Sequence, residues 1–141
     1  MTTLGTSIGL IALLTAVVMP GCGRPDVEVE FYFAHGYHFT QVERALIQAV
    51  ADAAARDVRR LLPTLPTRLV LRVAAGAEVI PETGETGDAY PPTTVRWTVD
   101  PGRPGGVART VRNHLRAALF HEFYHLVRYQ RVPRGGALRN E

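Results

Sequence analysis

The chain has 141 residues, a hydrophobic share of 46% and a formal net charge of +3. This length corresponds to one domain, and the hydrophobic share allows a packed core without disulfides or bound metal. All sixteen basic residues are arginines, and they are spread along the chain without a basic stripe interleaved with aromatic residues. The composition therefore gives no support for a protein that binds nucleic acid.

The first residues have the pattern of an export signal. Ile8 to Met19 is an apolar run of twelve residues, shorter than the about twenty residues that a helix needs to span a bilayer. Small residues follow at Gly21-Cys22-Gly23, as they follow the apolar region of a signal peptide before its cleavage site. Cys22 is the single cysteine, so no intramolecular disulfide can form.

The position of Cys22 directly after the apolar run resembles a bacterial lipoprotein signal, in which the cysteine is lipidated and becomes the mature N-terminus. We therefore expect residues 1–22 to be a lipoprotein-type signal peptide, cleaved before or near Cys22, and residues 23–141 to be the mature domain. The resemblance implies an exported protein, anchored by its lipid to a membrane of the bacterial cell envelope. A simple secretory signal, which would release the protein, is the alternative.

The mature region begins with a predicted strand and a predicted helix. Val27 to Phe33 alternates apolar with polar residues, which is typical of a half-buried strand. Histidines 35 and 38 fall in the loop that follows, where we expect them to be solvated. Thr40 and Glu43 have the capping-box pattern that opens a helix, and Pro63 ends it. Its expected apolar face consists of Val42, Leu46, Val50, Ala53, Val58, Leu61 and Leu62.

Two further strands and a long helix are predicted downstream. Arg68 to Val73 and Thr94 to Val99 both alternate as strands do. Residues 75–92 are rich in Gly, Pro, Glu and Asp and have no period, which predicts a mobile loop with at most a short paired segment near Val79. A helical period then runs from Val107 to about Gln130.

The predicted order is strand, helix, strand, strand, helix. This order predicts an α+β fold, in which a small three-stranded sheet, antiparallel or mixed, is packed by two long helices.

The last predicted helix contains the sequence His121-Glu122-Phe123-Tyr124-His125. The two histidines lie one turn apart on one face, about 6 Å along the axis. Both imidazoles can therefore reach one zinc ion at about 2.0–2.1 Å per nitrogen. Glu122 between them can act as a general base on a zinc-bound water. The alternative is an ordinary pair of surface or core histidines.

The HExxH motif and the order of the elements resemble the minimal core of the zincin metallopeptidases, in which a long helix after the sheet carries HExxH. The resemblance implies zinc-dependent hydrolysis of peptide bonds in a peptide or protein substrate. It implies His121 and His125 as zinc ligands and Glu122 as the catalytic base. It also implies that Thr94 to Val99, the strand before the active helix, is an edge that pairs with extended substrate.

A catalytic zinc site normally has three protein ligands and a water. His114 lies about 10.5 Å before His121 along the helix axis, too far for the same ion. No histidine follows His125, and Glu141 is the only acidic residue after the motif. Residues 119–141 resemble predicted bacterial zinc-dependent proteases, whose HExxH helix is followed by a short connection and a Glu-Gly that opens another helix. That resemblance implies Glu141 as the third ligand, in a domain that we expect to be truncated at its C-terminus.

Two interpretations follow from these patterns. The first is an exported, lipid-anchored zinc metallopeptidase, and the second is a catalytically inactive, truncated zincin-like envelope lipoprotein that serves in binding. A hydrolase of this kind also needs a donor for the substrate's carbonyl oxygen. The sequence offers four candidates for this donor, Tyr90, His114, Tyr124 and Arg128.

Overall fold

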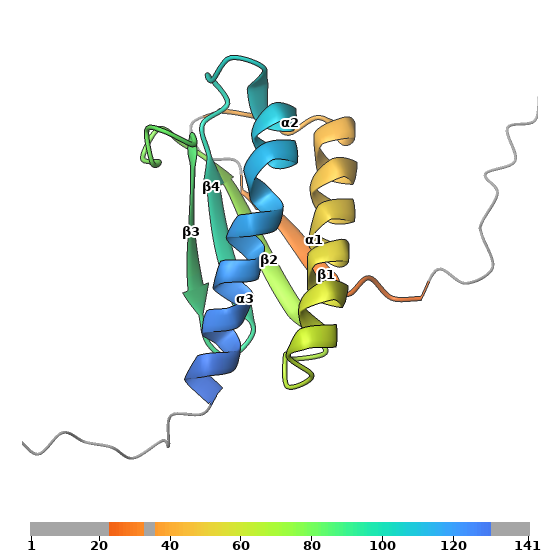
Figure 1. The fold of residues 1–141 in the computed structure, drawn as a ribbon. Helices are drawn as coiled ribbons and strands as arrows, with labels where there is room; N and C mark the ends of the chain where they lie inside the picture. Colours follow the sequence, from red (N-terminus) through yellow and green to blue (C-terminus); the bar gives the residue numbers. More distant parts are fainter. Residues whose placement is uncertain (1–22, 33–35, 131–141) are drawn as a thin grey trace, which may run out of the picture.

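The computed structural model describes residues 23–32 and 36–130. Its elements are β1 (Val27–Tyr32), α1 (Gln41–Leu61), β2 (Leu69–Ala75), β3 (Glu85–Tyr90), β4 (Thr94–Val99), α2 (Gly106–Thr110), the π-helical turn η1 (Val111–Leu115) and α3 (Arg116–Gln130) (Figure 1). Within this described part, no helix is both long enough and apolar enough to cross a membrane. The predicted signal sequence lies outside the described residues.

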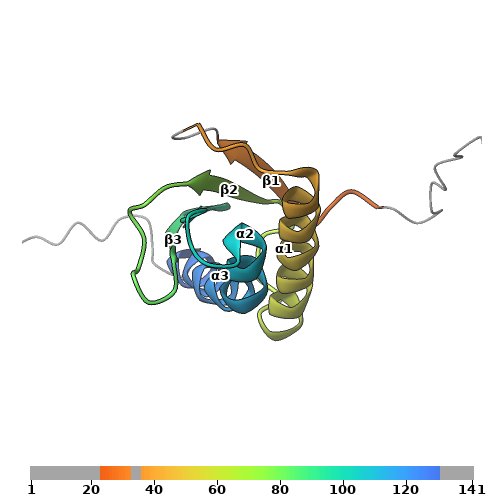
Figure 2. The same cartoon turned by 90° about the horizontal axis from the view of Figure 1, so that it is seen from above.

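The strands form one mixed sheet in the order β1-β2-β4-β3. β1, β2 and β4 are parallel, and α1 makes the crossover that two parallel neighbours need. β3 pairs antiparallel with β4 and forms the edge of the sheet. Seen from above, both long helices cover the same face of the sheet (Figure 2). The predicted α+β class is confirmed, but the sheet has four strands and the order is strand, helix, three strands, helix.

The additional strand lies in the segment that the sequence predicted to be a loop. β3 has the sequence Glu-Thr-Gly-Asp-Ala-Tyr, which contains residue types that are depleted in strands and therefore gives no strand pattern. The pairing expected near Val79 is a single bridge between Ile80 and Glu85. Because β3 covers one side of β4, the expectation that Thr94 to Val99 forms an edge is wrong, and β3 is the edge strand instead.

α1 begins where the sequence predicted, and its buried face matches the expected one only in part: Val58 is buried, and Leu46 and Val50 pack partly buried against the core. The Oγ1 of Thr40 accepts a hydrogen bond from the Glu43 N–H (3.1 Å), and the Glu43 carboxylate accepts one from the Thr40 N–H (2.8 Å). Val42 and Leu61 belong to the expected apolar face, yet each is 71% exposed. Small alanines let this helix approach its neighbours closely, so the larger side chains lie at the margins of the contact. The buried residues are Ile47, Ala51, Ala54, Ala55 and Val58.

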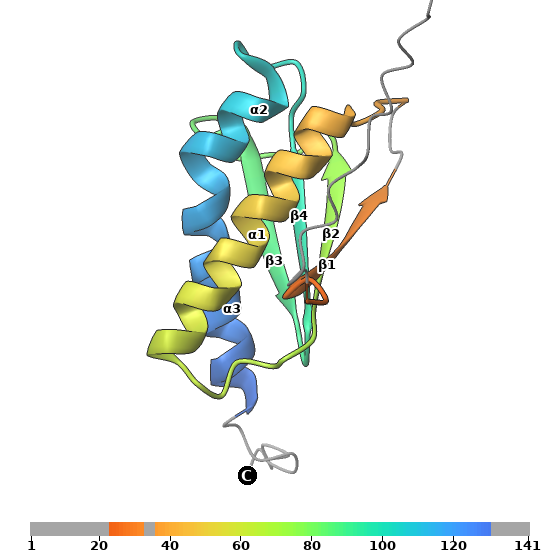
Figure 3. The ribbon, with the colours of Figure 1, turned by 90° about the vertical axis from the view of Figure 1, so that its right-hand side faces the viewer.

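The helix predicted from Val107 to Gln130 is confirmed as the consecutive elements α2, η1 and α3. Its buried side chains recur every four residues, at Val107, Val111, Leu115, Leu119 and Phe123. In a regular α-helix, four residues turn by about 40° more than one full turn. Over four such steps, a stripe of residues spaced by four would therefore rotate away from the core. The i→i+5 turn of η1 underwinds the helix and compensates for this drift. Residues Leu119 and Phe123 therefore face the core while α3 lies beside α1 (Figure 3).

The core fills the space between the sheet and the two helices. The predicted inward faces of β2 and β4 are buried, including Leu71, Val95 and Trp97 at 0% exposure. The indole Nε1 of Trp97 donates a hydrogen bond of 2.7 Å to the carboxylate of Glu85, a buried acid at the start of β3. This bond ties the edge strand to the centre of the core.

Candidate metal centre

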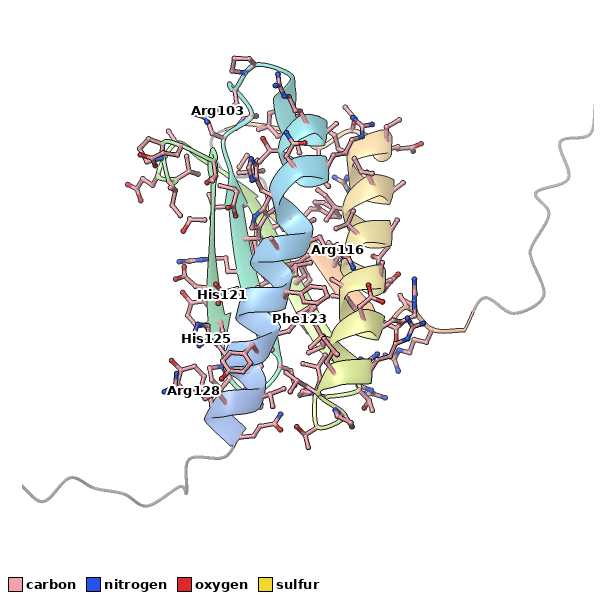
Figure 4. The ribbon with its side chains drawn as sticks, in the orientation of Figure 1. Arg103, Arg116, His121, Phe123, His125 and Arg128 are labelled. Carbon is pink, nitrogen blue, oxygen red and sulfur yellow. The ribbon has the colours of Figure 1, made fainter. Side chains whose placement is uncertain are left out.

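His121 and His125 meet on the side of α3 that faces β3, whereas Phe123 points away from that side (Figure 4). The two Nε2 atoms are 3.0 Å apart, and the ring planes are nearly perpendicular at 82°. His121 is exposed and His125 is partly buried. Two neutral imidazoles at this distance can share one N–H, or both can direct a lone pair at a single cation.

Glu122 lies between α3 and β3, with only 8% of the residue exposed. Its Oε1 is 4.0 Å from the Nε2 of His121. Gly87 of β3 packs directly on this carboxyl, since a Cβ at that glycine would lie 3.2 Å from the Cγ of Glu122 and 3.4 Å from its Oε1. A glycine at this position in the strand therefore makes room for the Glu122 side chain.

Burial raises the pKa of Glu122 above its ordinary value. Positive charge on His121 and His125 acts in the opposite direction, and the carboxylates of Asp88 and Glu85 add to the upward shift. A carboxylate with a raised pKa is a stronger base, which suits a group that accepts a proton from water.

A pocket of about 380 Å³ opens over this cluster. It is lined by Gly87, Asp88, Ala89 and Tyr90 of β3 and by His121, Glu122, His125 and Tyr129 of α3. A larger hollow of about 930 Å³ contains none of the motif residues. The strand residues Thr86, Arg96 and Thr98 line that hollow, and they alternate with buried neighbours, which places it on the face of the sheet without helices.

The outer edge of β3 runs beside the pocket. The carbonyl of Gly84 accepts a hydrogen bond of 2.9 Å from the Asp100 N–H. Because hydrogen-bonded and non-hydrogen-bonded residue pairs alternate along an antiparallel pair of strands, this bond shows which residues of β3 are hydrogen-bonded to β4. Glu85, Gly87 and Ala89 therefore direct their backbone N–H and C=O groups away from β4. Glu85 uses its carbonyl to accept from the Ile80 N–H. Within the described part of the chain, no strand pairs with Gly87 or Ala89 on this side.

The predicted third ligand falls outside what the structure describes. Among residues 23–32 and 36–130, no group of three or more His, Cys, Asp or Glu side chains is arranged to hold a metal ion. Glu141 lies beyond these residues, as do Cys22 and His35. His38 is exposed, as expected for a loop histidine, and His114 belongs to η1, away from the pocket. The described residues thus supply two converging nitrogen donors that a zinc ion could use, and no third ligand.

The structure also separates the four candidate donors for a carbonyl oxygen. Tyr90 lines the pocket at the edge of the sheet, but it alternates with Ala89 and so shares the helix-free face with Arg96, whose guanidinium lies 5.5 Å from its ring centroid. Tyr124, His114 and Arg128 do not line the pocket, although Tyr124 and Arg128 are on α3.

Tyr129 also lines the pocket, from the helix side, and was not among these candidates. Its position four residues after His125 is the sequence signal that would have indicated it, because residues four apart share a helix face.

Comparisons with models of protein families, with curated proteins and with solved structures found no match to this chain.

Proposed function

We propose that the chain is a zinc-dependent peptidase of the zincin type, which hydrolyses peptide bonds in an extended peptide or protein segment. We propose further that it is exported and anchored to a membrane of the bacterial cell envelope through a lipid on Cys22. One observation carries the proposed activity. The nitrogens of His121 and His125 converge at 3.0 Å beside the buried carboxyl of Glu122, next to the stretch of β3 whose outer edge pairs with no other described strand.

His121 and His125 would hold the zinc ion through their Nε2 atoms. The third protein ligand would come from outside the described residues, and Glu141 is our candidate for it. A bound zinc ion supplies an activated water and polarises a carbonyl group.

The residues of this chain provide the proton transfers and the position of the substrate. Glu122 would accept a proton from a water in the pocket and return it to the leaving amine nitrogen. The outward backbone groups of Gly87 and Ala89 can pair with an extended peptide, which would add to the sheet as a further strand. Such a peptide would run along the pocket that contains both histidines and Glu122.

The alternative is a catalytically inactive zincin-like protein that binds peptides at the same edge without cleaving them. It is favoured by the observation that the described residues supply two metal ligands and no third. Zinc binding and hydrolysis, measured separately, distinguish the two functions.

The decisive experiment compares the full chain with the variants Glu122→Gln and His121→Ala/His125→Ala. We expect the parent to bind one zinc ion and to cleave an unstructured protein such as casein. The double variant should lose zinc, because two ligands are removed. Glu122→Gln should keep zinc and lose at least about 100-fold in rate, because the general base is removed.

His114→Ala is the matched control, since this histidine lies on the same continuous helical run but outside the pocket. It should keep both zinc and activity. Zinc retained by the double variant would exclude the metal site. Equal cleavage by the parent and Glu122→Gln would exclude the proposed base, and zinc binding without any cleavage would favour the binding protein.

A further inference from the structure

We propose that Tyr129 donates a hydrogen bond to the carbonyl oxygen of the peptide bond that is cleaved. This inference rests on the proposed function and adds a catalytic residue to the two histidines and Glu122. It follows from the position of the phenol in the pocket, its availability and the chemistry that it can supply.

Tyr129 follows His125 by one helical turn, so the two side chains share a face of α3. Long side chains on a helix lean back toward its N-terminus, which brings the phenol of Tyr129 over the preceding turn. The two ring centroids are 6.2 Å apart, with the ring planes at 33°. Tyr129 thus lines the same pocket as His121, Glu122 and His125.

The hydroxyl of Tyr129 is available to a ligand. The residue is 52% exposed, and no hydrogen bond joins its hydroxyl to any other residue that the structure describes. A phenol can donate one hydrogen bond. The carbonyl oxygen gains negative charge as water adds to the carbon, so a donor aimed at it stabilises the transition state more than the ground state.

Tyr124 provides a matched control on the same helix. It is 50% exposed, and its ring centroid is also 6.2 Å from that of His125. Tyr124 does not line the pocket, however. The two tyrosines therefore share residue type, exposure and distance to His125, and they differ in whether they face the site.

The test uses the zinc-loaded full chain and its Tyr129→Phe and Tyr124→Phe variants, which keep the aromatic ring in each case. Four quantities are measured: zinc content, kcat for casein, KM for casein, and the Kd of a phosphinic analogue of tetra-alanine. The tetrahedral phosphorus of this analogue imitates the carbonyl carbon after water has added. Tyr129→Phe should lower kcat about 100-fold, as expected for the loss of one such donor. It should also weaken the phosphinic analogue about tenfold while zinc content and KM stay unchanged. Tyr124→Phe should match the parent in every measurement.

Several outcomes would overturn the inference. Tyr129→Phe could match Tyr124→Phe, could change KM alone, or could lose zinc, and in each case the phenol is not a transition-state donor. A parent without zinc overturns the proposed function together with this inference. A parent that holds zinc but does not cleave casein overturns the proposed peptidase and, with it, the role of Tyr129 in cleavage. In a parent that does cleave casein, the phosphinic analogue tests Tyr129 alone. If the parent and Tyr129→Phe bind the phosphinic analogue with equal affinity, or if neither binds it, the role of Tyr129 as a transition-state donor is rejected.

Discussion

At the scale of single residues, the site depends on a close contact between Gly87 and Glu122. The glycine lacks the methyl group that would lie 3.2 Å from the Cγ of Glu122. The carboxyl can therefore lie under β3 with its oxygens near His121. Strand sequences disfavour glycine, because it has no side chain to pack. Its presence in β3 is explained by the space that Glu122 requires.

Gly87→Ala should displace Glu122 and destabilise the fold by about 1 kcal/mol, the lower end of the range for overpacking. The free energy of unfolding can be measured through the fluorescence of Trp97, the single tryptophan. In a Glu122→Ala background the carboxyl is absent, so the same glycine replacement should cost much less. An equal cost in both backgrounds would show that the two residues do not interact through this contact.

At the scale of elements, the sequence predicted what local patterns determine. Thr40 and Glu43 form the capping box that their spacing indicates, and the buried faces of β2 and β4 follow the alternation of apolar residues. The face of α1 was right for Val58 but wrong for Val42 and Leu61, because the packing of neighbouring elements, and not side-chain size, selects which residues are buried. β3 was missed because its pairing with β4 outweighs its unfavourable residues.

The same distinction applies to the candidate site. The pattern of His121, Glu122 and His125 could be recognised because it is local to one helix. Gly87 belongs to the site only through the long-range pairing of β3 with β4, which no local pattern contains. Tyr129 also lies on the helix, but its place in the pocket depends on that strand as well.

Tyr37, which lies just before α1, should make the stability of the fold depend on pH in the alkaline range. The hydroxyl of Tyr37 donates a hydrogen bond of 2.8 Å to the carboxylate of Glu43. Burial, together with this bond and the charge of Glu43, raises the pKa of Tyr37 to about 12. The unfolded chain has the ordinary value of about 10, so the folded state holds this proton more tightly. The resulting stability is fully present below about pH 10 and is lost as the pH rises through about 12.

Tyr37→Phe should therefore lower the free energy of unfolding at neutral pH by about 1 kcal/mol. Between about pH 10 and 12 the variant should lose less stability than the parent, because it lacks the titrating group. Tyr32→Phe is the control, since Tyr32 also donates to a glutamate, Glu30, but at an exposed position. Urea unfolding across the pH range measures both effects. Parallel pH profiles for the parent and Tyr37→Phe would contradict the assignment.

At the scale of the whole molecule, the core and the candidate site lie on different sides of α3. Leu119, Phe123 and Leu126 are fully buried in the core, while His121 is exposed at the pocket. The core is built from the strands, α1 and the buried stripe of the last helix, and neither His121 nor His125 belongs to it. The fold should therefore not need the metal, in contrast to small zinc domains that unfold without it.

Removal of zinc with a chelator should leave the secondary structure unchanged and keep a single cooperative unfolding transition, followed by circular dichroism and Trp97 fluorescence. Added zinc should then raise the free energy of unfolding by about 2.7 kcal/mol at a hundredfold excess over its Kd, because it binds only the folded chain. His121→Ala/His125→Ala should unfold like the chelated parent and should not respond to zinc. Loss of the cooperative transition on chelation would mean that the metal is structural, so that zinc content alone could no longer be taken as support for a catalytic site.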